Sequence, residues 1–274
     1  ILDEAQTMGI KGFPKHTVNL HNVSIPKGNI LGPPGKGMES AQSTFMFIRL
    51  CMGGLCLGAI KKLIQISTTY AFNRTIASGS LLDNPVSRIT LTNLINGATA
   101  LETLVKVVAQ KLENKEIVPE PAFIVTKTLG GELLSLTADK SIQMLGARGY
   151  EEANMVAQMY RDGRPFRIFE GPTEVLINYL GTQAYFDTGD VYQLLEQNFK
   201  NKWKANQLRA FVQKIKSKYD KEAICDAKDT NLWVYSVIGE IAQWMILSAA
   251  LEFANQPALE AAKQWVEAKV VEVL

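Results

Sequence analysis

One carboxylate of this chain is a candidate for acid–base chemistry. Glu170 follows the apolar pair Ile168-Phe169 and precedes Gly171, where a new helix is expected to begin. Apolar surroundings raise the pKa of a carboxyl group, which suits a general base for an acidic C–H bond. The alternative is an acidic residue that caps the helix N-terminus beside the arginines of segment 161–167. The residue types alone leave both interpretations open.

A second stretch could approach a ligand through its backbone. Residues 143–150 read Gln-Met-Leu-Gly-Ala-Arg-Gly-Tyr and are expected to end a helix in a loop punctuated by glycine. Glycines adopt left-handed conformations without strain, and the N–H groups that such a loop exposes can contact a bound group closely.

Two other motifs carry weaker signals. Residues 32–37, Gly-Pro-Pro-Gly-Lys-Gly, resemble a phosphate loop, but the spacing differs from GxxxxGK[ST] and prolines cannot donate hydrogen bonds. A plain turn is therefore the better interpretation. His16 and His21 have no acidic or thiol neighbours in the pattern of a metal site, so no metal is predicted.

The composition describes a globular chain with little net charge. Its 274 residues are 47% hydrophobic, enough for one large or two modest cores, and the formal net charge is +2. No basic run could hold a phosphate backbone, so nucleic acid is not an expected partner. Three scattered cysteines favour a reducing compartment over secretion. Because the chain opens on Ile1 and not Met, it is interpreted as a fragment or a processed product.

Hydrophobic periodicity predicts a mainly α fold. Apolar residues recur at helical spacing over residues 39–70, 91–112 and 119–145, and the short connections favour an antiparallel bundle. Gly130-Gly131, inside the third helix, cost about 1 kcal/mol each relative to alanine and indicate close contact between helices.

Three domains are expected. Residues 1–38 form a short β segment with strands at 16–20 and 23–25, residues 39–185 the antiparallel helical bundle, and residues 186–274 a second helical domain. The bundle would end with a short helix over residues 174–184.

The apolar stretch 232–251 could pass for a membrane span. Its polar residues Ser236, Glu240 and Gln243 favour a buried helix instead. The amphipathic helices of residues 186–274 could also make weak contact with a membrane surface.

Residues 161–174, Arg-Asp-Gly-Arg-Pro-Phe-Arg-Ile-Phe-Glu-Gly-Pro-Thr-Glu, resemble the signature of acyl-CoA dehydrogenases, especially of the very-long-chain branch. Three more blocks agree in order. Residues 8–37 resemble the end of the family's middle β-domain, and residues 49–74 resemble its first bundle helix. Lys127 and Gln143-Met-Leu-Gly fall where the family's third helix and its QxLGGxGY loop belong. Four motifs in matching order and spacing, over roughly residues 8–185, make the resemblance specific.

The resemblance implies a flavin-dependent oxidoreductase of fatty acid metabolism that desaturates an acyl thioester. By position, Glu170 would be the base that takes the α-proton while a hydride passes to FAD. Some branches place the base at the position of Ile48, which cannot ionise, and this favours Glu170. Arg49 would contact the CoA moiety, and Gly171 would leave room for the acyl chain. The implied substrate-binding residues are Met46, Phe47, Ile48, Arg49 and Gly171.

The resemblance also implies an FAD site shared between subunits. In the family, an arginine at the position of Arg74 and the loop at 143–147 reach the FAD of the neighbouring subunit. A homodimer or homotetramer is therefore expected. The implied FAD contacts are Arg74, Gln143, Met144, Leu145, Gly146, Ala147, Pro172, Thr173 and Glu174.

Several positions depart from the family pattern. Met46 stands where an acidic residue is usual, so a different carrier is expected, either an acyl carrier protein or an unusual CoA ester. Pro172 replaces a threonine and removes a donor near the flavin. The family's N-terminal helical domain and nearly all of its β-domain are missing from these residues. The alternative function is therefore a non-catalytic helical assembly or carrier-binding subunit of the same fold.

The implied partners are an acyl-CoA or acyl-carrier thioester and an electron-transfer flavoprotein that accepts the electrons. The implied location is the cytoplasm in a bacterium and the mitochondrion in a eukaryote.

Overall fold

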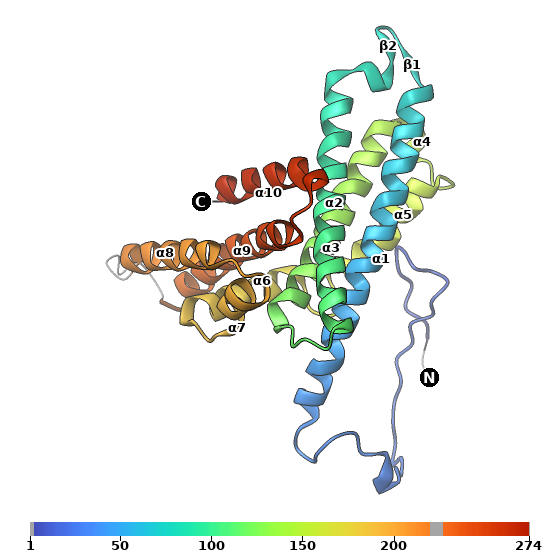
Figure 1. The fold of residues 1–274 in the computed structure, drawn as a ribbon. Coiled ribbons are helices and arrows are strands. Elements are labelled where there is room, and N and C mark those ends of the chain that lie inside the picture. Colours follow the sequence, from blue (N-terminus) through green and yellow to red (C-terminus); the bar gives the residue numbers. More distant parts are fainter. Residues whose placement is uncertain (1–2, 220–226, 274) are drawn as a thin grey trace.

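The computed structural model describes residues 3–219 and 227–273. Three long helices form its centre: α1 (Gly37–Asn73), α2 (Pro85–Glu113) and α3 (Glu120–Leu145) (Figure 1). The short connections between them reverse the chain twice, so α2 runs antiparallel to both of its neighbours. The three helices coincide closely with the predicted ranges, and the mainly α fold class is confirmed.

Local chemistry explains where these helices begin and end. The side chain of Asn84 accepts from the backbone N–H of Val86 at 2.9 Å, and Pro85 occupies the first helical position of α2. At the same end of the bundle, α3 stops at Gly146, whose φ of 62° ends the helix without the strain of a side chain.

Glycines bring α1 and α3 into close contact. Gly130 on α3 faces Gly53 on α1, so that a Cβ on Gly130 would lie 3.3 Å from the Gly53 Cα, and a Cβ on Gly53 would overlap Thr126. A Cβ on Gly131 would lie 2.8 Å from the carbonyl oxygen of Phe166. The close helix contact predicted from the Gly130-Gly131 pair is confirmed.

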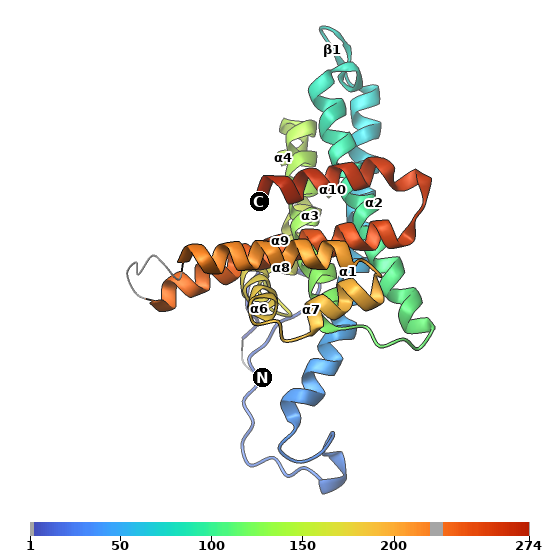
Figure 2. The same cartoon turned by 60° about the vertical axis from the view of Figure 1, so that its left-hand side comes forward.

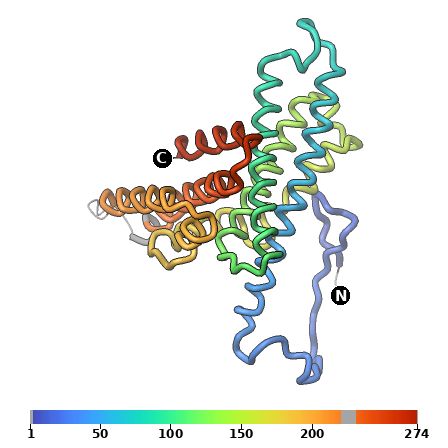
Figure 3. The backbone as a smooth tube through the Cα atoms, in the orientation of Figure 1, coloured from blue at the N-terminus to red at the C-terminus, as the bar shows by residue number. Residues whose placement is uncertain are grey.

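The predicted strands at 16–20 and 23–25 are wrong. Among the described residues, the sheet consists only of β1 (Thr75–Ile76) and β2 (Gly79–Ser80), with Thr75 opposite Ser80. The N-terminal segment runs as an extended trace outside the bundle (Figure 3) and makes a single bridge, between Glu4 and His16. Strand-forming side chains there, including Leu20 at 75% exposure, meet no partner strand, and an unsupported pair is only marginally stable.

The same segment confirms the simpler interpretation of its glycine- and proline-rich end. The chain passes through the short 3-10 helix η1 (Lys27–Asn29) and then a turn, in which the N–H of Lys36 donates to the carbonyl of Pro33 at 3.0 Å. Residues 32–36 form a turn that leads directly into α1.

Shorter helices complete the bundle and build the second helical region. Next to the bundle lie η2 (Leu81–Asp83), α4 (Ala147–Tyr150), α5 (Met155–Gly163), η3 (Arg164–Arg167) and α6 (Thr173–Phe186). The extension contains α7 (Asp190–Gln193), the π-helical turn η4 (Leu194–Asn198), α8 (Lys202–Tyr219), α9 (Ala227–Ala254), η5 (Pro257–Leu259) and α10 (Glu260–Val273). Helices α8, α9 and α10 run across the long axis of the bundle (Figure 2).

Helix α6 joins the bundle to the extension. Gly181 on α6 and Gly239 on α9 cross so closely that a Cβ on either residue would overlap the backbone of the other helix. Buried side chains form one continuous hydrophobic core from α1, α2 and α3 through α6 to α8, α9 and α10. The domain boundary near residue 185 remains a prediction from the sequence.

A buried lysine joins helices α8, α9 and α10 of the extension. The Lys204 side chain is 1% exposed, and its ammonium lies 2.7 Å from a carboxylate oxygen of Glu267 on α10 and 3.3 Å from one of Glu252 on α9. Two carboxylates therefore compensate the charge that α8 places in the core.

Within the described ranges 3–219 and 227–273, two helices are long and apolar enough to cross a membrane by length and composition: α1 and residues 231–254 of α9. Most of the apolar window in α9, 72%, is buried inside the protein, against 33% of the window in α1. The predicted burial of residues 232–251 is thus confirmed.

The α6–α9 crossing predicts a position-specific effect of alanine. Gly239→Ala should lower the free energy of unfolding by about 1–3 kcal/mol or more, because the helices must separate to admit the methyl group. Gly54→Ala is the control: a Cβ there meets no atom within 4 Å, and alanine should stabilise α1 by about 1 kcal/mol. Urea denaturation of both variants measures the difference, and equal effects would contradict the close crossing.

Candidate functional site

The candidate base lies on a tight turn between η3 and α6. Glu170 has a φ of 56° and Gly171 a φ of 99°, so two consecutive residues are left-handed. Glycine adopts this conformation freely, but a glutamate there costs about 1–3 kcal/mol and needs support from its surroundings. The turn also lacks space, since a Cβ on Gly171 would lie 3.0 Å from the side chain of Leu176.

Cations from α1 and α3 hold the two carbonyls of this turn. The Arg49 Nε donates a long hydrogen bond, 3.5 Å, to the carbonyl oxygen of Glu170. The Lys127 ammonium donates to the carbonyl oxygen of Gly171. Arg49 is itself anchored, because its Nη1 lies 3.0 Å from a carboxylate oxygen of Glu120. The parallel helices α1 and α3 thus support the strained turn from one side.

The Glu170 carboxylate has no partner within the described part of the chain. Its Oε2 is buried and makes no hydrogen bond. Arg167 pairs instead with Glu132, at 2.6 Å, and no side chain caps the N-terminus of α6. The interpretation of Glu170 as an acidic cap beside the arginines is therefore wrong, because its side chain makes no capping hydrogen bond to α6. An unpaired, partly buried carboxylate can accept a proton from a bound molecule.

Lys127 was assigned no role from the sequence. Its side chain is 1% exposed, and burial, reinforced by the charge of Arg49, lowers the pKa of the ammonium to about 8. The signal that could have identified it is a single charged residue within the otherwise uncharged run 122–131.

The substrate candidates of α1 lie beside the turn. Met46, Phe47 and Ile48 directly precede Arg49, whose contact with Glu170 places this helical turn next to the loop. Phe47 is 58% exposed, and Met46 and Ile48 are half-buried. The structure therefore brings residues 46–49 and Gly171 together with Glu170.

The FAD candidates fall into two groups at different ends of the bundle. Pro172, Thr173 and Glu174 start α6, next to Glu170. Arg74 follows the last residue of α1, 25 positions beyond Arg49, which corresponds to about 37 Å along the helix.

The loop at 143–147 lies with Arg74 at that far end. A hydrogen bond of 2.9 Å between Ser67 and Ser141 places the C-terminal part of α3 beside that of α1. In Figure 1, α4 and the β1–β2 hairpin lie near one end of the long helices, away from α6. The two groups of candidates thus do not meet within one chain.

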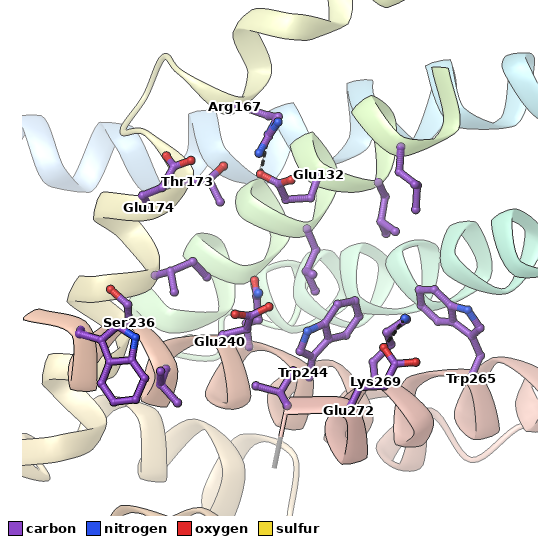
Figure 4. Close-up of a pocket in the computed structure, with 18 residues that line it drawn as sticks. Glu132, Arg167, Thr173, Glu174, Ser236, Glu240, Trp244, Trp265, Lys269 and Glu272 are labelled. Atoms are coloured by element: carbon purple, nitrogen blue, oxygen red, sulfur yellow. Dashed lines mark hydrogen bonds and ion pairs between the residues drawn. The ribbon is translucent and has the colours of Figure 1, made fainter. Parts of the chain in front are cut away.

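A cavity of about 690 Å³ lies between parts of the bundle and the extension (Figure 4). Thr173 and Glu174 line it from α6, and the Thr173 hydroxyl is buried without a hydrogen-bond partner. Tryptophans of α9 and α10 and the Arg167–Glu132 ion pair line other walls. The start of α6 therefore offers an unsatisfied hydroxyl and uncapped backbone N–H groups to a ligand.

The buried lysine predicts a pH dependence of stability. The folded pKa of Lys127 is about 8, below its ordinary 10.5, so above pH 8 the unfolded state binds more protons and stability rises with pH. Relative to Lys127→Met, the wild type should gain about 2 kcal/mol between pH 7 and pH 9.5. Urea titrations of both proteins across this range measure the change, and a constant difference would refute it.

Comparisons with known proteins agree with this fold. The family model for the acyl-CoA dehydrogenase C-terminal domain matches residues 35–185. The probable acyl-CoA dehydrogenase FadE10 of Mycobacterium tuberculosis is 29% identical over 192 residues, covering 65% of this chain and 29% of that protein. The human mitochondrial very long-chain specific acyl-CoA dehydrogenase is 26% identical over 199 residues, covering 71% of this chain and 30% of that protein.

A solved structure extends the likeness to the extension. The Bacillus anthracis acyl-CoA dehydrogenase complexed with FAD has a TM-score of 0.77 at 22% identity, over 99% of this chain and 54% of that chain. The chain spans about 30% of the length of the curated relatives it matches. Because the family model covers more than half of the chain, the chain belongs to the acyl-CoA dehydrogenase family and contains its C-terminal domain.

Proposed function

We propose that this chain forms the C-terminal part of a flavin-dependent dehydrogenase that desaturates acyl thioesters, with Glu170 as the base. The observation that carries the proposal is a buried carboxylate oxygen without a partner, on a strained turn whose carbonyls are held by two cations. Strained backbone that the surroundings enforce is typical of functional sites.

The turn prepares both the base and a donor for the substrate. Glu170 receives the α-proton on its unpaired carboxylate. The α C–H becomes acidic only when the thioester carbonyl is polarised, and the backbone N–H of Glu170 would donate to that oxygen.

The start of α6 fits an anionic cofactor. The unpartnered Thr173 hydroxyl and the uncapped first turn of α6 suit the diphosphate of FAD. FAD, when bound, supplies an acceptor for the hydride from the β-carbon. Pro172, Thr173 and Glu174 would hold it from one chain.

The remaining FAD contacts would come from a second copy. Arg74 lies about 37 Å along α1 from Arg49, and the 143–147 loop begins about 24 Å along α3 from Lys127, which is why one chain does not bring them to the same cofactor. We therefore propose a homodimer or homotetramer with shared sites, and this separation supports that proposal.

The substrate would lie between α1 and the turn. Residues Met46, Phe47 and Ile48 would contact the thioester and Gly171 its acyl chain, while Arg49, now paired with Glu120, would contact the CoA moiety. An acyl-CoA or acyl-carrier thioester is the proposed substrate and an electron-transfer flavoprotein the proposed electron acceptor. The bacterial and mitochondrial relatives favour a cytoplasmic or mitochondrial location.

The decisive test is Glu170→Gln in the complete flavoprotein. The amide keeps the size of the side chain but cannot take a proton, so turnover of long-chain acyl-CoA should fall about 100- to 10,000-fold. Flavin absorbance should remain, because the substitution leaves the start of α6 intact. Anaerobic mixing with acyl-CoA measures flavin bleaching in both proteins.

Glu151→Gln is the matched control, since Glu151 is an exposed carboxylate in the loop after α4. It should bleach like the wild type. Full turnover by Glu170→Gln would remove Glu170 from the role of base. A wild-type protein that binds no flavin would favour a non-catalytic assembly or carrier-binding subunit.

A further inference from the structure

Lys127 donates to a backbone carbonyl, whereas the buried lysines Lys111 and Lys204 pair with carboxylates. Lys111 pairs with Glu116 at 2.8 Å, and Lys204 pairs with Glu267 at 2.7 Å. Within residues 3–219 and 227–273, no carboxylate lies within ion-pair distance of Lys127. Its one hydrogen bond to a described residue is the bond to the Gly171 carbonyl.

Stability alone does not explain this arrangement. A buried ammonium without an opposite charge loses its hydration, and the nearby Arg49 adds repulsion. An apolar side chain of the same length would fill the space at a lower energetic cost. We therefore look for the role of the Lys127 charge at the Gly171 carbonyl, the group to which its ammonium donates a hydrogen bond.

The bond acts next to the strained residue. Gly171 directly follows Glu170, and both are left-handed. Without a donor for the Gly171 carbonyl, the turn could relax toward the more common backbone conformations, and the Glu170 carboxylate would move with it. Arg49 holds the preceding carbonyl only by a long bond of 3.5 Å, so Lys127 is the shorter of the two attachments.

We propose that Lys127 is a positioning residue: its buried ammonium, through the Gly171 carbonyl, holds Glu170 in the left-handed conformation from which the carboxylate reaches the α-proton. This inference rests on the proposed function of Glu170. Lys127 touches neither the substrate nor the flavin in this scheme. Its contribution should therefore appear in the chemical step and not in binding.

The test compares Lys127→Met with the wild-type flavoprotein. Methionine fills the space but donates no hydrogen bond, so kcat should fall about 10- to 100-fold while KM for acyl-CoA changes less than about threefold. Hydrogen–deuterium exchange followed by mass spectrometry should show faster amide exchange in residues 168–176. If the methionine variant does not fold, Lys127→Gln replaces it. The glutamine side chain is one bond shorter than that of lysine, so its amide should not reach the Gly171 carbonyl. The kcat of this variant should therefore fall as well.

Lys204→Met is the matched control, because Lys204 is equally buried but lies in the extension. It should lose stability without changing kcat or the exchange of residues 168–176. A merely structural role of Lys127 would produce the same pattern as this control.

Glu170→Gln, measured in parallel, separates the two proposals. If Glu170→Gln is inactive and Lys127→Met or Lys127→Gln keeps the wild-type kcat, Lys127 is not a positioning residue and Glu170 remains the base. If Glu170→Gln retains full turnover, the proposed function fails, and with it the role of Lys127. Loss of kcat with an unchanged KM and faster exchange confined to the turn would support the inference.

Discussion

The close contact between α1 and α3 is the interaction on which the candidate site depends. Gly53 and Gly130 let the two helices approach until backbone faces backbone. At that distance Arg49 and Lys127 both reach the same short turn. A larger residue at either glycine would separate the helices and draw at least one cation away from the carbonyl that it holds. The geometry of the site therefore depends directly on how closely α1 and α3 pack.

Several energetic costs coincide at the candidate site. Lys111 and Lys204 are buried with carboxylates, whereas Lys127 is buried against a backbone carbonyl. Glu170 adds a left-handed backbone and a carboxylate oxygen without a partner. Backbone strain and unpaired polar atoms close together are typical of a ligand-binding site. The continuous hydrophobic core around it supplies the stability that tolerates them.

Helix α6 connects this site to the extension. Its first turn offers the Thr173 hydroxyl next to the loop, and its later turns cross α9 through Gly181 and Gly239. The cavity beside Thr173 has walls from both regions. The extension therefore shapes the surroundings of the start of α6, and it is not an independent appendage.

Local patterns in the sequence determined the helices and the identity of the candidate base, because periodicity and the motif at 161–174 involve residues close together in the chain. They did not reveal that residues 16–25 lack partner strands, since pairing depends on edges elsewhere. Nor did they show that Lys127 holds the carbonyl of Gly171, 44 residues away. Only the tertiary structure decided which carboxylate stays unpaired and which cation supports it, because both follow from the parallel packing of α1 and α3, which joins segments distant in the sequence.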